Sequence, residues 1–480
     1  MMNDKKKKSL LTMMFAEPDP KTQIQNEDVI KRKYAIFPIL IFISLYILYF
    51  ISYLGRKSIT VALHPMQDAS ILDLHTYGII MAVYYFTYAV GKFIGGIFAD
   101  RANLRFALPA SIGISSIITA GLAFSPDLYL NGYIQSKTFM LLLMYLSWGL
   151  AGLIQAAAFP LCAKALTFWF PNKNRSFVWS WWSTSHELGS AASLGIATVI
   201  LQLSGKWQYV FYIPTIISII VCILTLFTLR DKPVTLGLPN VEEYHQTIKK
   251  DIIKKDEPID NRSYWQVFKE ELLTNKNIWL MGFSFFFVYI LRFGPMDWLP
   301  KQYMSNNEVG SIFKVLLIPI MGCIGTLTIP YVSKYWFKNR RAPATFTYLM
   351  VGALMLIVFR LTTTYGDVTP IIDLSFNPTL KNIVDFFTMS FIGISTYGPL
   401  VLIGGIASIE NASKRVASAA TGFTGSMGYV GAIISSLFLS DAIDKYGFSI
   451  TANFWIISAI VGACLCIPMW KVTSSKDYSH

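Results

Sequence analysis

The stretch AIFPILIFISLYILYFISYLGRK, residues 35–57, is an uninterrupted apolar run that ends in an Arg-Lys pair. A helix needs about 20 mostly apolar residues to cross the hydrocarbon core of a bilayer. The run therefore predicts a transmembrane helix over residues 35–55. Eleven further runs of this kind follow it, with approximate limits 78–98, 106–125, 139–168, 178–203, 209–229, 278–299, 310–336, 344–362, 383–409, 417–439 and 450–470.

The composition of the whole chain agrees with this interpretation. Of its 480 residues, 54% are hydrophobic and 14% are charged, and the mean hydropathy is +0.47. A soluble domain carries about 25% charged residues, so a soluble globule and a disordered chain are both excluded. The five cysteines lie inside apolar runs, which indicates buried free thiols rather than a disulfide framework. We expect an all-α integral membrane protein with twelve transmembrane helices.

One long hydrophilic stretch interrupts the spans, from Arg230 to Lys276, almost midway along the chain. It is interpreted as a linker between two six-helix bundles. The expected organisation is a cytoplasmic N-terminal tail (1–34), an N-terminal bundle (35–230), a cytoplasmic linker (231–276), a C-terminal bundle (277–470) and a cytoplasmic C-terminal tail (471–480).

The basic residues set the expected orientation in the membrane. Lys and Arg gather in the N-terminal tail, at Arg101 and Arg105, in the central linker and at Lys338–Arg341, whereas the opposite loops carry few of them. Positively charged loops stay on the cytoplasmic side, so both termini are expected in the cytoplasm. The chain is expected in the cell inner membrane.

The two halves of the sequence share a Tyr-x-x-Arg pattern at corresponding positions. Tyr53-Leu54-Gly55-Arg56 ends the first span, and Tyr289-Ile290-Leu291-Arg292 occupies the seventh, 236 residues later. Two bundles with matched first helices are typical of transporters built from parallel repeats, whose binding site lies near the midplane between the repeats. This pattern predicts pseudo-twofold symmetry and a central site.

Charged side chains inside the apolar runs are the candidate functional residues. Each costs about 2.5–3.5 kcal/mol at the centre of a membrane helix on insertion scales. The ionisable residues in these runs are Arg56, Lys57, Lys92, His186, Glu187, Arg292, Asp297, Lys314, Arg360 and Glu410. Most of them are cationic, so a cavity that they line would bind an anion.

Arg56 and Arg292 are the main candidates because a guanidinium group matches phosphate oxygens with two parallel hydrogen bonds. The alternative is that each extends to an interface or that one pairs with Asp297. Lys57 and Asp297 are expected to form an ion pair that holds the two halves, although a passive position at a helix end explains them nearly as well.

Two further cations have weaker signals. Lys92 follows Tyr88 by four residues and so shares a helix face with it, but a lysine near a helix end often reaches to the interface. A histidine side chain ordinarily titrates in the range of the second phosphate ionisation, which makes His186 a candidate, although a lone histidine is as often a packing residue.

The chain has no Walker, His-Glu-x-x-His or Gly-x-Ser-x-Gly motif. No enzyme activity, cofactor, metal or nucleic acid is therefore expected.

The loop after the second span resembles a known signature. Gly96, Asp100, Arg101 and Arg105 match the G-x-x-x-D-R-x-x-x-R pattern of the major facilitator superfamily. Four longer stretches resemble its organophosphate:phosphate antiporters, a family that includes the bacterial glycerol-3-phosphate and hexose-phosphate transporters. These stretches are Tyr53–Lys57, Trp182–Gly189, Tyr289–Trp298 and Tyr397–Gly404.

The resemblance, which runs from about residue 35 to 470, implies the major facilitator fold and exchange of an organic phosphate for inorganic phosphate by alternating access in a monomer. It implies that Arg56 and Arg292 bind phosphate and that Lys92 and His186 line the cavity. Asp100 and Arg101 would belong to the gate, as would the Lys57–Asp297 pair. The cavity aromatics implied in this way are Tyr49, Tyr53, Tyr88, Tyr289 and Tyr397.

The stretch Ala419–Gly425 is similar to the glycerol-3-phosphate branch, with Thr421 and Thr424 where the hexose-phosphate branch has Asp and Lys. Glycerol-3-phosphate is therefore the favoured substrate, and hexose 6-phosphate the next.

The sequence departs from the family pattern at two places. The eighth span has Ile318-Pro319-Ile320 where the glycerol-3-phosphate branch has a carboxylate, and the second-half counterpart of the Gly-Asp-Arg signature is reduced to Tyr331–Lys334. A sensor of sugar phosphate that binds without transporting is the alternative function.

Overall fold

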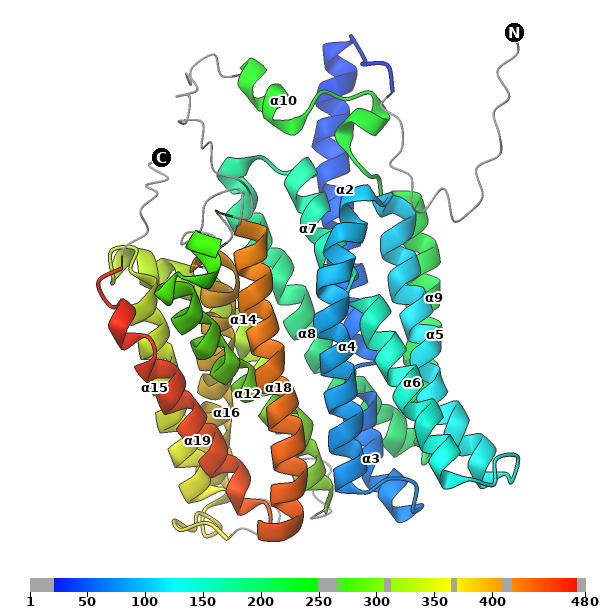
Figure 1. Ribbon diagram of the computed structural model, residues 1–480, viewed down its shortest axis with the longest axis vertical. Coiled ribbons are helices and arrows are strands. Elements are labelled where there is room, and N and C mark those ends of the chain that lie inside the picture. The colour runs from blue at the N-terminus through cyan, green and yellow to red at the C-terminus, as the bar shows by residue number, and fades with distance from the viewer. Residues whose placement is uncertain are drawn as a thin grey trace.

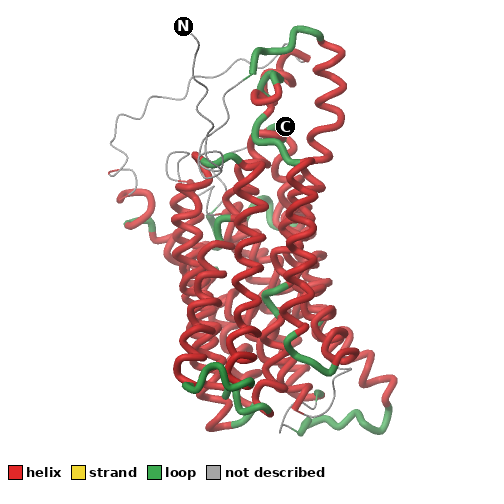
Figure 2. Tube along the Cα trace, turned by 90° about the vertical axis from the view of Figure 1, so that its right-hand side faces the viewer, coloured by secondary structure: helices red, strands yellow, loops and turns green. Residues whose placement is uncertain are grey.

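The computed structural model describes residues 21–248, 266, 269–305, 312–363, 369–407 and 417–472, and every regular element among them is helical (Figures 1 and 2). Twelve helical stretches in this part of the chain are long and apolar enough to cross a membrane. This confirms the expected all-α membrane fold. Most of the N-terminal tail, the centre of the linker, Glu410 and most of the C-terminal tail lie outside the described residues, as do the side chains of Asp100 and Arg101.

The N-terminal bundle contains α2 (Glu27–Leu54), α3 (Ser58–Asp68), α4 (Leu74–Arg101), α5 (Leu104–Leu130), α6 (Lys137–Gln155), α7 (Ala158–Trp169), α8 (Asn172–Ser204) and α9 (Tyr209–Thr228). The C-terminal bundle contains α12 (Lys276–Ser305), α13 (Ile312–Val315), α14 (Leu317–Tyr335), α15 (Arg341–Thr362), α16 (Pro378–Val401), the π-helical turn η4 (Leu402–Ala407), α18 (Ala417–Tyr446), α19 (Ser449–Cys464) and η5 (Ile467–Met469). The two bundles stand side by side in Figure 1.

The first helix begins at Glu27, earlier than the apolar run indicates. Asn26 caps it, because its side chain accepts hydrogen bonds from the backbone N–H groups of Asp28 at 3.0 Å and Val29 at 3.3 Å. The acidic Glu27 and Asp28 in the first turn also suit the positive end of the helix dipole. The expected tail therefore ends at about residue 26, and α2 extends beyond the rest of the bundle (Figure 2).

The start of the linker packs against this extension of α2. The linker contains the short helices η1 (Pro233–Leu236) and α10 (Val241–Ile248), with η2 (Lys269–Leu273) just before α12. The ring of Tyr34 on α2 stacks on Tyr244 of α10 with centroids 4.1 Å apart, and its hydroxyl donates to the Pro239 carbonyl at 2.6 Å. Residues 231–248 are thereby attached to the N-terminal bundle.

Two spans of the N-terminal bundle are interrupted near their middle. The first breaks at Gly55, Arg56 and Lys57 between α2 and α3, and the fourth breaks at Ala156 and Ala157 between α6 and α7. Broken helices in membrane proteins occur where the irregular backbone is buried in protein or lines a cavity. The first break carries Arg56 and Lys57 into the interior of the protein.

The bundles contact each other in the half of the molecule opposite α10. There α4 meets α18 so closely that a Cβ atom on Gly78 would lie 2.5 Å from Ser440 Oγ, and a Cβ on Gly195 of α8 would lie 3.3 Å from Leu316 before α14. At the other ends of α4 and α18, a Cβ on Gly96 or Gly422 would meet no atom within 4 Å. At the described positions the two bundles therefore approach each other more closely at the end opposite α10 than at the other end.

Candidate functional site between the bundles

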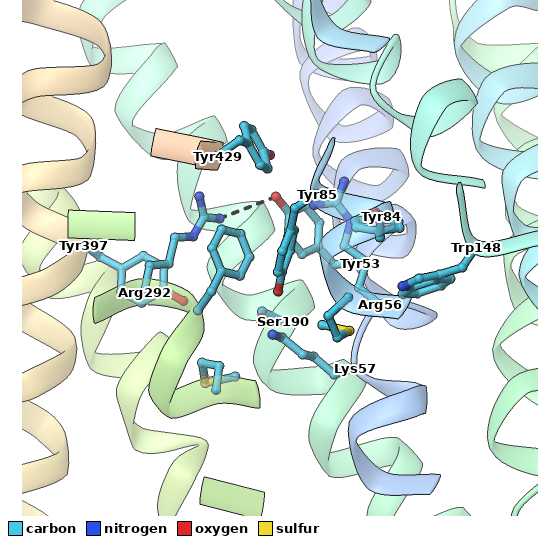
Figure 3. Close-up of a pocket in the computed structure, with 13 residues that line it drawn as sticks. Tyr53, Arg56, Lys57, Tyr84, Tyr85, Trp148, Ser190, Arg292, Tyr397 and Tyr429 are labelled. Atoms are coloured by element: carbon cyan, nitrogen blue, oxygen red, sulfur yellow. Dashed lines mark hydrogen bonds between the residues drawn. The ribbon is translucent and has the colours of Figure 1, made fainter. Parts of the chain in front are cut away.

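A cavity near the middle of the molecule lies between the two bundles. Its wall is mostly aromatic, with two arginines and one lysine (Figure 3). The lining residues are Tyr53, Arg56, Lys57, Met81, Tyr84, Tyr85, Trp148, Ser190, Arg292, Phe293, Met296, Tyr397 and Tyr429.

Arg56 is held at this cavity by the N-terminal bundle. Its side chain is 7% exposed, and its Nε donates to Gln155 Oε1 at 2.7 Å. The same Gln155 oxygen accepts from the Tyr84 hydroxyl at 2.6 Å, and the Gln155 amide donates to the Ser52 carbonyl at 2.5 Å. Gln155 is the last residue of α6, so the two helix breaks place a guanidinium and its acceptor together. The burial of Arg56 excludes the alternative that it extends to the membrane surface.

Arg292 approaches the cavity from the C-terminal bundle, and the acceptor for its guanidinium among the described residues is the Tyr53 hydroxyl rather than an amide. It is 6% exposed on the continuous helix α12. Its guanidinium carbon lies 5.0 Å from the ring centre of Phe293 and 5.6 Å from those of Tyr289 and Tyr397. The electron-rich faces of these rings stabilise a buried cation without neutralising it.

Tyr53 lies between the two arginines (Figure 3). The guanidinium carbon of Arg56 is 3.9 Å from the centre of its ring, and Arg292 Nη2 lies 3.5 Å from its hydroxyl oxygen. Within the part of the chain that the structure describes, neither arginine has a carboxylate within ion-pairing distance, and Arg56 Nη2 has no hydrogen-bond partner. Two positive charges thus face one cavity with only aromatic and amide partners.

Lys92 and His186 lie at the margin of this cluster. The Lys92 ammonium is 4.3 Å from the ring centre of Phe159 and 5.5 Å from that of Tyr429. His186 is 8% exposed, and its ring centre lies 5.7 Å from that of Tyr53 and 6.3 Å from that of Tyr397. Both side chains therefore belong to the same aromatic cluster as the arginines.

Lys57 and Asp297 form a buried ion pair that joins the two bundles. The second carboxylate oxygen of Asp297 accepts from the Tyr85 hydroxyl at 2.5 Å, and the Tyr77 hydroxyl lies 3.3 Å from the Asp297 carbonyl. Each oxygen of the Asp297 carboxylate thus has a hydrogen-bond donor. The pair forms although the eighth span has Ile318-Pro319-Ile320 where the glycerol-3-phosphate branch has a carboxylate. Lys314 pairs separately with Asp385 at 2.6 Å.

The sequence-predicted aromatic residues surround the same centre. Tyr49 packs on Tyr53 with centroids 5.7 Å apart, and the rings of Tyr88 and Tyr289 each lie 5.1 Å from that of Tyr429. Tyr429 of α18 connects the groups from both bundles, yet sequence reasoning did not select it. Gln155, Tyr84 and Tyr85 were also not selected.

Gln155 is recognisable in the sequence as an amide inside an apolar run, but it carries no charge and so does not belong to the ionisable residues named above. Among the described residues, no cluster of three or more His, Cys, Asp or Glu side chains could hold a metal. The site offers cations, hydroxyls and aromatic faces, which suit binding of an organic anion rather than covalent chemistry.

Comparison with protein-family models gives a match to the Major Facilitator Superfamily over residues 45–436. The chain belongs to this superfamily. It is a family of membrane transporters rather than enzymes, in agreement with the absence of catalytic motifs.

Among solved structures, the chain is similar to a bacterial homologue of the human lysosomal transporter Spinster in an inward-facing, unoccupied conformation. That likeness has a TM-score of 0.61 at 16% identity and covers 90% of this chain and 95% of the other. At this identity it supports the fold alone.

Several curated relatives match nearly the whole of this superfamily member. A probable hexose phosphate transport protein of Chlamydia pneumoniae is 29% identical, with 98% of this chain and 99% of the relative covered. The glycerol-3-phosphate transporter of Bacillus subtilis is 27% identical over 96% and 99% of the two chains. The membrane sensor protein UhpC of Escherichia coli is 28% identical over 91% and 93%.

Proposed function

We propose that the chain is a secondary transporter that exchanges an organic phosphate for inorganic phosphate by alternating access. The observation that carries this proposal is the arginine pair. Arg56 and Arg292 come from corresponding helices of the two bundles, are buried at one cavity and have no carboxylate partner within ion-pairing distance among the described residues. The relatives named as hexose-phosphate and glycerol-3-phosphate transporters support the same class of substrate.

Charge explains why such a site would favour exchange over uniport. The empty cavity holds two uncompensated guanidinium groups on opposite bundles, and moving the bundles together would bring like charges closer. A bound phosphate would contact both groups, neutralise them and draw the bundles together. The carrier would then change conformation readily when either phosphate or the organic phosphate is bound, and slowly when it is empty.

Glycerol-3-phosphate is the proposed preferred substrate and hexose 6-phosphate the next. The support is the sequence at Thr421 and Thr424, which lacks the Asp and Lys of the hexose-phosphate branch. Thr424 is fully buried and donates to the Ala420 carbonyl at 3.0 Å. This threonine would therefore act through the packing of α18 rather than by touching the sugar.

We also propose the orientation in the cell inner membrane. The basic ends of α2, α5 and α8 share one end of the molecule with α10, and this end is assigned to the cytoplasm (Figure 1). The bundles then converge on the extracellular side, which is the arrangement of an inward-facing carrier. Because one chain provides the whole cavity, a monomer is the proposed functional unit.

Counterflow in proteoliposomes tests the proposal. Vesicles loaded with inorganic phosphate are offered labelled glycerol-3-phosphate or labelled glucose 6-phosphate. Uptake is expected to depend on internal phosphate and to be lost in Arg56→Ala and Arg292→Ala. Arg32→Ala, which removes an exposed arginine from α2, the helix that precedes Arg56, is the matched control and should transport normally. Undiminished flux in either buried-arginine variant would overturn the proposal.

The alternative is a membrane sensor, because UhpC of Escherichia coli is one of the relatives. A sensor would bind the same organic phosphates and show no flux. Binding measured by isothermal calorimetry with no uptake of either substrate would therefore favour this function over transport.

A further inference from the structure

One buried carboxyl group of the molecule has no role in the proposed phosphate site. Glu187 lies near the middle of α8 and is 0% exposed. It faces α14, where the Thr326 hydroxyl donates a hydrogen bond to Glu187 Oε1, so the contact links the two bundles. Its other oxygen, Oε2, has no hydrogen-bond partner among the described residues.

The groups around Glu187 do not compensate a negative charge. Tyr46 of α2, Cys323 of α14 and Tyr397 of α16 bring hydroxyl and thiol groups, which supply no positive charge, so Arg292 of α12 and the neighbouring His186 are the groups that could carry one. Within the described chain, neither of these two lies within 4 Å of the Glu187 carboxyl oxygens. Both also face the phosphate cavity, where Arg292 is committed to the anion.

An ionised carboxylate without a counter-ion is costly in such a position. Burying an isolated charge costs far more than burying a hydrogen-bonded neutral group, and a buried carboxyl can avoid this cost by taking up a proton. A protonated Glu187 would need only hydroxyl or carbonyl partners, and Thr326 provides one. The interface between α8 and α14 is therefore suited to a neutral carboxylic acid.

We propose that Glu187 is a proton-binding site that is occupied whenever α8 and α14 are packed together and is emptied when they separate. The inference rests on the proposed transport function and orientation. These helices meet from Glu187 and Thr326, near the middle of both helices, to Leu316, which lies in the half of the molecule assigned to the extracellular side. Opening that half would expose Glu187 to external water, where the carboxyl ionises and releases its proton. Closing it would require a proton from the same medium.

The proton therefore exchanges only with the outside and is not carried across the membrane. External acid would favour closure of the extracellular half, and external alkali would slow it, whereas internal pH would have little effect through this group. A single site of this kind can change the population of the closed state by at most about tenfold per pH unit. Exchange of the two phosphates would keep its stoichiometry and gain a dependence on external pH.

Infrared spectroscopy of the purified protein in membranes tests the site without any transport. The wild type at neutral pH should show the carbonyl stretch of a protonated carboxylic acid. The band should be absent in Glu187→Gln and unchanged in Glu27→Gln, which removes an exposed carboxylate from the start of α2. In Thr326→Val the band should shift, because the hydroxyl donor is gone while the carboxyl remains. Identical spectra in all four proteins would overturn the proposal.

Exchange in proteoliposomes, with external and internal pH varied separately, tests the consequence. Wild type should slow several-fold as external pH rises from about 6 to about 8, and Glu187→Gln should exchange at a rate that loses this dependence. Ionisation of the substrate affects both proteins equally, so the difference between them reports Glu187. Loss of exchange in Glu187→Gln at every pH would show that the negative charge is needed and would overturn the proposal. If wild type itself did not exchange, the proposed function would fail, and the infrared band would still decide whether Glu187 holds a proton.

Discussion

The Lys57 ammonium group and the Asp297 carboxylate form an ion pair across the interface between the two bundles, with Lys57 4% and Asp297 1% exposed. Lys57 lies in the break between α2 and α3, directly after Arg56, and Asp297 lies on α12 five residues after Arg292. Each member of the pair is thus close in sequence to one of the two buried arginines. The ion pair that joins the two bundles is thus connected along the chain to the cavity.

Removing one member of this pair should destabilise the protein strongly. Asp297→Asn or Lys57→Ala leaves the other charge buried without its partner, which costs about 3–5 kcal/mol. The double variant Lys57→Ala/Asp297→Ala removes both charges and should recover much of this loss. Thermal unfolding of the purified protein measures the effect. Lys31→Ala, which breaks the exposed pair with Glu27 at 3.4 Å, should change stability by less than about 1 kcal/mol. Equal effects of the buried and exposed variants would contradict the assignment.

Gln155 should control the affinity of Arg56 for an anion. Its Oε1 oxygen accepts from Arg56 Nε, so Gln155→Glu places a carboxylate on the guanidinium and competes with phosphate. Phosphate affinity is expected to fall by at least about tenfold, since a charged partner strengthens a hydrogen bond by more than about 1.4 kcal/mol. Isothermal calorimetry with inorganic phosphate measures the change.

Gln202→Glu is the matched control for this substitution. Gln202 is exposed on α8, so the same change of charge there should leave phosphate affinity unaltered. Unchanged affinity in Gln155→Glu would mean that Arg56 does not contact the anion.

The sequence was sufficient to predict the fold and to single out charged residues that the structure places at or beside the candidate cavity, for a physical reason. Spans are visible because lipid demands long apolar runs, and Arg56, Arg292, Lys57 and Asp297 are visible because a charge inside such a run is costly. The packing that places these four groups together cannot be predicted from such local patterns. It depends on which of twelve similar helices contact one another.

The parts that sequence reasoning missed involve neutral residues and local backbone. The break at Gly55–Lys57 is followed by another helix of apolar residues, so the run reads as one span that ends at the arginine, whereas Arg56 lies in the interior. Gln155, Tyr84 and Tyr429 carry no charge and do not stand out among 25 tyrosines and many polar residues. Their importance comes from distances across helices that no local pattern encodes.

The N-cap of α4 predicts a dependence of stability on pH. Asp73 Oδ1 accepts from the Thr76 backbone N–H at 2.6 Å, and this hydrogen bond lowers the pKa of the carboxyl below its usual value. A carboxyl with a lowered pKa in the folded state stabilises above its unfolded pKa and loses this contribution as pH falls through the folded pKa. Because Asp73 is largely exposed, solvent screens its charge, and the hydrogen bond provides most of the effect.

Asp73→Ala should therefore cost about 1 kcal/mol at neutral pH, and this cost should decrease as pH falls through the lowered pKa of the wild-type carboxyl. Thermal unfolding at a series of pH values measures the difference between the two proteins. A difference that stays constant across this range would show that the charge of Asp73 does not contribute.

The close approach of Gly78 to α18 should determine which conformation the protein prefers. A Cβ atom at this position would lie 2.5 Å from Ser440 Oγ and 3.0 Å from the Ser436 carbonyl, so Gly78→Ala forces α4 and α18 apart in the half opposite α10. Opening that half is expected to favour the outward-facing state and to lower the exchange rate several-fold. Accessibility of single cysteines placed at the end of α4 that is proposed to be extracellular, read with an impermeant thiol reagent, should increase. Gly422→Ala on α18 adds a methyl group that meets no atom within 4 Å and should change neither accessibility nor exchange. Equal accessibility in the two variants would mean that this contact does not separate during transport.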